Sequence, residues 1–261
     1  MKHKRINSFY IGFVLLFLYL PIIILIVYSF NSSKMNILFE NFTFNWYKNL
    51  FNNSELLEAF FNTMIIAIVS TVISTIIGTI SAIGIDKYDF KLKKMVNILI
   101  YIPIVIPEIV LGISLLSMYT LMKLDLGLFT LILSHIAFSI PFVIVSVRSS
   151  LSEIIKTYEE AAYDLGASKF VTFFKITLPM ILPGVISGAT LAFTLSLDDV
   201  VISYFTAGPG SNTLPLKIYS MIKTGITPDV NALSTLMLFV TVIILTFSVI
   251  VQSRKITSKV V

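Results

Sequence analysis

The sequence predicts an all-α polytopic membrane protein that crosses a bilayer six times. Of its 261 residues, 56% are hydrophobic and 13% are charged, and the mean hydropathy is +0.93, whereas soluble domains average about 25% charged residues. Six apolar runs are each long enough to cross a bilayer, which takes about 20 residues. They cover residues 9–28, 59–85, 95–118, 128–147, 181–205 and 232–251. We expect a single transmembrane domain over residues 1–261, with no appended soluble domain.

The basic residues predict that both termini face the cytoplasm. With the N-terminus inside, fourteen of the nineteen Lys and Arg residues fall in cytoplasmic segments and five in outer segments, and such an excess marks the cytoplasmic side. The first run follows Lys2, Lys4 and Arg5, as a signal peptide would. It is full length, however, and Ser29-Phe30-Asn31 offers no small-x-small cleavage site. We therefore expect a retained first helix.

Several classes of function are disfavoured by composition. The chain has no cysteine, which removes disulfides, thiol nucleophiles and cysteine metal sites. The net charge of +5 does not indicate nucleic-acid binding, because the basic residues flank the apolar runs. Gly208-Pro209-Gly210 lacks the Lys-Ser/Thr of a phosphate-binding loop. We expect no catalytic residue, metal site or cofactor in this chain.

The outer segment 31–58 contains the one tryptophan, Trp46. Trp46, Tyr47, Leu50 and Phe51 follow helical spacing, which predicts a short helix at the membrane interface. Tryptophan is enriched at that depth. Trp46 is therefore either an interfacial anchor or a contact for a transported solute.

The loop at residues 150–180 should form a helix–turn–helix elbow on the cytoplasmic side. Ser150-Leu151-Ser152-Glu153 has the spacing of a capping box, which predicts a helix start. An apolar stripe at helical spacing follows. Its members are Ile154, Tyr158, Ala161, Ala162 and Leu165.

The end of this helix is predicted by Gly166, since glycine readily takes the left-handed conformation that ends helices. Ser168 is placed to cap a second short helix that runs to Lys175. Leu178-Pro179 is expected to turn the chain into the fifth span. An elbow of this kind could pass rigid-body motion from a partner into the spans.

Three carboxylates lie within the predicted spans: Glu108, Asp198 and Asp199. An acid at a helix centre costs about 2.5–3.5 kcal/mol on insertion scales, and no Lys or Arg lies in a span to pair with these. At about 1.5 Å per residue, Glu108 lies roughly 20 Å and the two aspartates roughly 26 Å from the cytoplasmic side. The three acids suit a cationic solute, although the aspartates could instead sit at a solvated helix end. His135, at comparable depth, is expected to form a hydrogen bond between helices.

Backbone features accompany the acids. Pro103 and Pro107 weaken the helix around Glu108, and broken helices often line transport paths. A small-residue stripe on the fifth span predicts close packing of helices. It consists of Gly184, Gly188, Ala192 and Ser196.

Part of the loop is similar to the EAA signature of ABC-importer permeases. Every fixed position and gap of the signature is matched. The matching residues are Glu160-Ala161-Ala162, then Gly166 after three residues, Ile176 after nine more and Leu178-Pro179 after one more. The resemblance implies the type I importer permease fold. It also implies that these residues dock a cytoplasmic ATPase.

The last third of the chain resembles the permeases of spermidine/putrescine ABC importers. The resemblance rests on Ser196-Leu197-Asp198-Asp199 and on Leu214-Pro215-Leu216-Lys217-Ile218-Tyr219-Ser220. It implies a bacterial cell-membrane complex of this chain with a second, non-identical permease, two ATPase subunits and an external polyamine-binding protein. Polyamines are flexible cations, and spaced carboxylates with aromatic faces would recognise them.

Three alternatives stay open. A permease for thiamine, iron or phosphonate would not need three acids. An ion-coupled secondary transporter could use them as a proton relay, which ATP-independent uptake would reveal. An intramembrane aspartyl hydrolase would need two acids facing each other, whereas adjacent residues on a helix diverge by about 100°.

Overall fold

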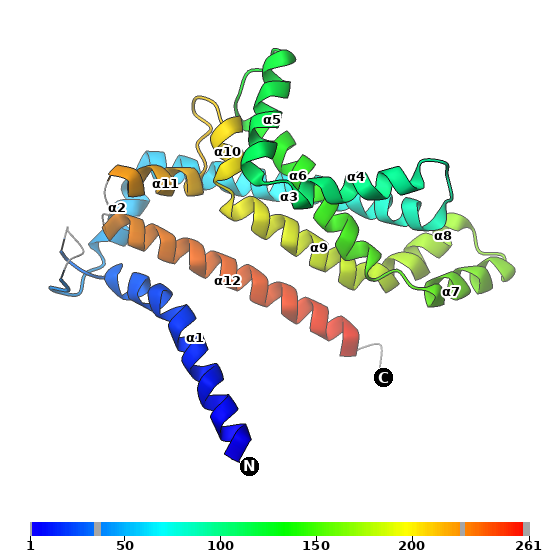
Figure 1. The fold of residues 1–261 in the computed structure, drawn as a ribbon, viewed down its shortest axis with the longest axis horizontal. Helices are drawn as coiled ribbons and strands as arrows, with labels where there is room; N and C mark the ends of the chain where they lie inside the picture. The colour runs from blue at the N-terminus through cyan, green and yellow to red at the C-terminus, as the bar shows by residue number, and fades with distance from the viewer. Residues whose placement is uncertain (1, 34–37, 225–227, 258–261) are drawn as a thin grey trace. The chain divides into compact units, whose positions relative to one another are not determined.

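A computed structural model describes residues 2–33, 38–224 and 228–257. Two residues that entered the orientation count, Lys34 and Lys259, lie outside them. The described parts are almost entirely helical (Figure 1). The elements are α1 (Lys2–Tyr28), α2 (Asn45–Asn52), α3 (Ser54–Lys87), α4 (Lys93–Val105), α5 (Glu108–Leu121), α6 (Leu128–Arg148), α7 (Glu153–Asp164), α8 (Lys169–Thr172), the π-helical turn η1 (Phe173–Thr177), α9 (Leu178–Asp198), α10 (Val201–Thr206), α11 (Leu214–Thr224) and α12 (Pro228–Thr257).

Five described segments are long and apolar enough to cross a membrane, and α4 with α5 makes a sixth if the pair is one broken span. The five are Tyr10–Tyr28, Ser54–Lys87, Leu128–Arg148, Lys169–Asp198 and Pro228–Ile250. These segments confirm the all-α polytopic class and the number of apolar runs.

The third predicted span is not one continuous helix. Between α4 and α5 the chain bends by 108°, and the corner is visible in Figure 1. The break follows from Pro107, which disfavours the helical conformation of the residue before it. Ile106 is accordingly extended, with φ −66° and ψ 135°. The depth of Glu108 therefore cannot be counted along one straight helix.

The fifth predicted span also differs from the structure at both ends. No turn occurs at Leu178-Pro179: α8 continues through η1 into α9, and Lys169–Asp198 forms one apolar segment. Proline lacks the N–H that would bond four residues back, and the π turn lies just before it. At the other end α9 stops at Asp198, and Asp199 is extended, with φ −63° and ψ 126°. Asp198 and Asp199 thus lie at a helix end, not within a helix.

Contacts within the chain divide it into two compact units. Unit 1 comprises Met1–Glu58 and Lys217–Val242, and unit 2 comprises Ala59–Leu216 and Ile243–Val261. In unit 1, α2 is the short helix predicted in the outer segment, and Tyr47 lies 2.7 Å from Ser29 through their hydroxyls. Lys217 pairs with Glu55 at 2.6 Å.

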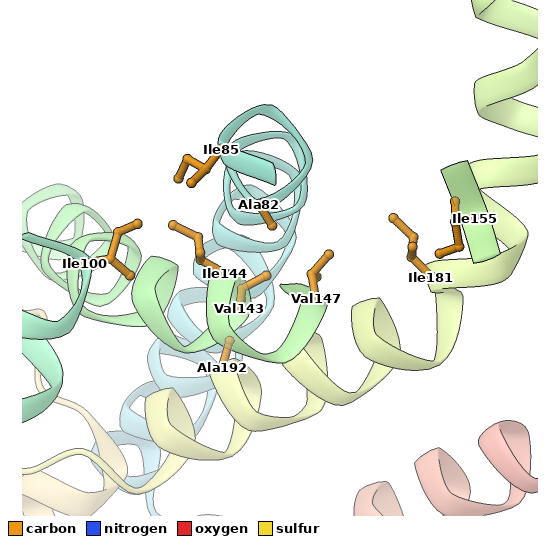
Figure 2. Close-up of a cluster of buried hydrophobic side chains, with 9 residues drawn as sticks. All are labelled: Ala82, Ile85, Ile100, Val143, Ile144, Val147, Ile155, Ile181 and Ala192. Carbon is orange, nitrogen blue, oxygen red and sulfur yellow. The ribbon is translucent and has the colours of Figure 1, made fainter. Parts of the chain in front are cut away.

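The core of unit 2 is an apolar cluster between α3, α4, α6, α7 and α9 (Figure 2). Figure 2 shows Ile155 of α7 and Ile181 of α9 together at one end of the cluster. Burial of such side chains contributes about 1.5–3 kcal/mol each. Through Ile155, the loop helix α7 is therefore part of the core and not a loose appendage.

The small-residue stripe of α9 packs against α6, as predicted. Gly184, Gly188, Ala192 and Ser196 are all buried. A Cβ on Gly188 would lie 3.2 Å from the Cα of Val143, and one on Gly184 would lie 2.8 Å from the carbonyl oxygen of Ser146.

Filling this contact should destabilise unit 2. We expect Gly184→Val to lower stability by about 1–3 kcal/mol, as overpacking does, because backbone atoms of α6 cannot move aside. Thermal unfolding of the purified protein in detergent measures the loss. Gly84→Ala is the matched control, since a Cβ there meets nothing within 4 Å. Equal melting temperatures for the two variants would contradict close packing of α6 on α9.

Candidate functional site

Three acidic residues of unit 2, Glu108, Asp198 and Asp199, line a cavity of about 370 Å³ between α4, α5, α6, α9 and α10. Its position follows from the two breaks in the chain, because the α4–α5 corner and the α9–α10 corner both open onto it. The lining residues are Pro103, Ile104, Ile106, Glu108, Leu111, Phe138, Phe142, Leu195, Asp198, Asp199, Val200, Val201 and Ile202. The structure thus brings together the three carboxylates that the sequence singled out.

Glu108 and Asp198 are both exposed, but they sit at opposite kinds of helix end. Glu108 is the first residue of α5, where the positive end of the helix dipole favours a carboxylate. Asp198 is the last residue of α9, where the negative end disfavours one. The stability of α9 therefore gives no reason for a charge at Asp198.

Asp199 has a different environment from its neighbour. It is buried and accepts hydrogen bonds from the backbone N–H of Ile202 at 3.1 Å, and from the N–H and hydroxyl of Ser203 at 2.7 Å each. His135 lies 3.5 Å from its carboxylate. These bonds hold the start of α10, so most of the acceptor capacity of Asp199 is already used.

His135 joins α6 to both sides of the α9–α10 corner, as expected of a hydrogen-bonding residue between helices. Its ring nitrogens lie 2.6 Å from the hydroxyl of Ser196 and 3.2 Å from that of Ser203. The Ser196 hydroxyl lies 3.2 Å from that of Ser70 on α3. This buried network holds the α9–α10 corner in place and thereby fixes the position of Asp198, the last residue of α9.

Two aromatic residues of the cavity were missed from the sequence. Phe138 and Phe142 are one turn apart on α6 and both line the cavity. Phe138 also makes an edge contact with the ring of His135, with centroids 5.2 Å apart. Two phenylalanines in an apolar span give no signal, because lipid-facing and cavity-facing residues look alike there.

Trp46 is not among the residues that line the cavity. It belongs to α2 in unit 1, is half-buried, and donates its indole N–H to the backbone carbonyl of Asn31 at 2.6 Å. This bond ties α2 to the segment that follows α1, and the role of Trp46 as an anchor at the membrane interface stays a prediction. A contact between Trp46 and a solute stays a prediction.

The second candidate site is the elbow formed by α7, α8 and η1. Its first helix begins at Glu153 with Ser152 as N-cap and no side-chain capping bond, so the capping box predicted from Ser150 is wrong. The cause is tertiary: Ile155 enters the core and sets where the helix begins. The two residues Ile155 and Glu159, one turn apart, form the buried face of α7.

The outward face of α7 carries the apolar stripe. Ile154 is 63% exposed, Tyr158 56% and Leu165 90%. Glu160 and Ala161 are exposed as well, and Ala162 is half-buried. Of the later motif residues, Ile176 and Leu178 are half-buried and Pro179 is exposed. Such apolar exposure away from the spans marks an interaction surface.

Gly166 ends α7 as predicted, with φ +82°. Its N–H donates to the carbonyl oxygen of Tyr163 at 2.9 Å, and the N–H of Ala167 donates to the carbonyl oxygen of Ala162 at 2.9 Å. These two hydrogen bonds are the pair that defines a Schellman cap. Ser168 then caps α8 by accepting from the N–H of Val171 at 3.3 Å. The elbow angle therefore depends on one left-handed residue.

Comparison with known proteins identifies the family of this chain. Residues 74–254 match the family described as "Binding-protein-dependent transport system inner membrane component". The chain is 43% identical over 239 residues to the spermidine/putrescine transport system permease protein PotC of Escherichia coli K12, covering 92% of this chain and 90% of that protein. It is 40% identical to PotC of Haemophilus influenzae over 99% of both chains. It is 39% identical to the putrescine permease PotI of Escherichia coli K12, over 90% of this chain and 85% of PotI.

Solved structures show the same fold at low sequence identity. A bacterial ABC transporter for import of the acidic polysaccharide alginate aligns with a TM-score of 0.72 and 16% identity, covering 94% of both chains. The methionine transporter MetNI aligns with a TM-score of 0.66 and 20% identity, covering 77% of this chain and 95% of that one. Because the family model matches more than half of the chain, the chain belongs to the family of binding-protein-dependent transport system inner membrane components.

Proposed function

We propose that this chain is the permease subunit of an ATP-driven polyamine importer. It forms the translocation path with a second, non-identical permease, receives putrescine or spermidine from an external binding protein, and is driven by two ATPase subunits. The observation that carries this proposal is the cavity that places Glu108 and Asp198 beside Phe138 and Phe142.

The chemistry of the cavity fits a flexible polycation. Each exposed carboxylate offers a charge-assisted hydrogen bond to an ammonium group, and phenyl rings attract cations through their faces. The methylene segments of a polyamine suit the apolar walls that Leu111 and Leu195 provide. Relatives named for spermidine and putrescine transport support the same solute class.

A solute of the opposite charge would not suit this cavity. One structural neighbour imports an acidic polysaccharide, which two carboxylates without a lysine or arginine among the cavity's lining residues would repel. A secondary transporter using the acids as a proton relay would work without ATP, and membership of a binding-protein-dependent family speaks against it.

The elbow is the proposed ATPase contact. Its exposed stripe of Ile154, Tyr158 and Leu165 gives a partner an apolar surface. Glu160 adds a charge at the middle of that face, and Ala161 allows close approach. The charge bias of the sequence predicts that this loop lies in the cytoplasm, where ATP is.

Polyamine uptake should require two different permeases. We expect vesicles containing this chain and the ATPase alone to take up no labelled putrescine or spermidine. Uptake should appear when the second permease and the loaded binding protein are added. ATP-dependent uptake by the homodimeric complex would contradict the need for a partner permease. Uptake without ATP would favour the secondary transporter.

A further inference from the structure

The inward face of α7 holds a buried carboxylate that the proposed docking does not use. Glu159 is 6% exposed. Its Oε1 lies 2.7 Å from the Nζ of Lys87, the last residue of α3, and also accepts a hydrogen bond from the hydroxyl of Thr177 in η1. These three residues, called here the Glu159 junction, all belong to unit 2 and join three separate elements.

An ion pair in this position is not needed to hold α7 in place. Removing charges from water is costly, and apolar residues of similar size often stabilise a buried site as well or better. Ile155, one turn earlier on the same face, already buries its side chain in the core. What the Glu159 junction adds is a directional link, since a charged hydrogen bond fixes distance and orientation where an apolar contact allows sliding.

The elements that the junction joins are those through which motion must pass. α7 carries the proposed docking face, and α3 is a 34-residue apolar helix. Thr177 lies in η1, where the regular hydrogen-bond ladder is interrupted as α8 runs into α9. Single π turns of this kind occur often at functional sites. A shift of α7 therefore displaces the end of α3 and the π-helical turn η1 that leads into α9.

We propose that the Glu159 junction is the positioning element that transmits movement of the docked ATPase from α7 into α3 and α9. This inference rests on the proposed function. The two adjacent glutamates then have different roles, because exposed Glu160 meets the ATPase, whereas Glu159 points away from it and carries the movement onward. Loss of the junction should leave the ATPase bound but weaken the link between hydrolysis and transport.

The test uses the complete complex, with both permeases, the ATPase and the binding protein, in proteoliposomes. Glu159→Gln keeps the side-chain volume and removes the charge. We expect the amount of bound ATPase to match wild type, and spermidine taken up per ATP hydrolysed to fall at least about fivefold, the lower end of typical coupling between sites. The charge-swapped pair Glu159→Lys with Lys87→Glu should recover part of the loss, although either single change would not.

A matched control is available in the exposed pair Lys93–Asp89, at 2.8 Å. The hydrogen bond from Lys93 holds the pKa of Asp89 below its usual value, and the attraction of Asp89 for Lys156 of α7 is the smallest contribution. The two paired residues are four positions apart in one segment, so Asp89→Asn should behave nearly as wild type. An unchanged ratio of uptake to hydrolysis in Glu159→Gln would overturn the proposal. Loss of assembly without a change in that ratio would reduce the junction to a structural role and would overturn it as well.

A result that contradicts the proposed solute can be told apart from a result that contradicts the proposed role of the Glu159 junction. A wild-type complex that binds the ATPase but takes up no polyamine would contradict the proposed function alone. The junction is then judged by how strongly the binding protein stimulates ATP hydrolysis by the complex, because that signal must cross the same link between the spans and α7. Equal stimulation by wild type and Glu159→Gln would refute it.

Discussion

Uptake of putrescine and spermidine should fall by about ten- to a hundredfold when Asp198 is replaced by Asn, because a hydrogen bond to a charged group contributes about 1.5–3 kcal/mol. Glu108→Gln should act in the same way, since both carboxylates are exposed in the same cavity. Asn and Gln preserve shape while removing the attraction for ammonium groups. The measurement is labelled polyamine uptake, normalised to assembled complex in the membrane.

Asp199→Asn provides the contrast within this experiment. Because Asp199 is buried and bonded to Ser203 and Ile202, its replacement should reduce the amount of folded protein more than the transport by each complex. Wild-type uptake in the Glu108→Gln, Asp198→Asn, Asp199→Asn triple variant would return all three acids to structural roles. So would an Asp198 variant that loses assembly but transports normally per complex.

Replacing Gly166 by Val should have the second large effect, on assembly with the ATPase. Gly166 has φ +82° and nothing within 4 Å of an added Cβ. The free-energy cost of the Val side chain therefore comes from backbone strain and not from a steric clash. A left-handed residue other than glycine costs about 1–2 kcal/mol, which corresponds to a factor of roughly 5–30 in an equilibrium. We expect co-purified ATPase and ATP-driven uptake to fall together within that range.

Gly166→Asn is the control for this prediction. Asparagine tolerates the left-handed conformation better than valine does, so the variants should rank Asn above Val in bound ATPase. Circular dichroism of the purified chain should show the helix content unchanged in both. Full ATPase binding by Gly166→Val would count heavily against a docking role that depends on the elbow angle.

The breaks in the third and fifth spans could not be predicted in full from the sequence. Pro103 and Pro107 indicated a weakened helix, but a proline does not specify the angle, and the 108° bend depends on the helices packed around it. At the other break, no proline or glycine precedes Asp199 to signal a helix end. Its bonds to Ile202 and Ser203 are local, but its neighbour His135 comes within reach only once α6 lies beside α9.

The sequence by itself determined the number of apolar runs, the loop pattern from Glu160 to Pro179, the left-handed cap at Gly166 and the candidate acids, because each depends on local composition or on spacing along one helix. Only the tertiary structure decided which acids are exposed and which are buried. Asp198 and Asp199 are chemically identical neighbours, and Glu159 and Glu160 are another such pair. One member of each pair is exposed and the other is buried among partners from distant segments. The physical reason is that burial and pairing depend on which helix face meets a neighbour, and that is set by packing between elements far apart in the chain.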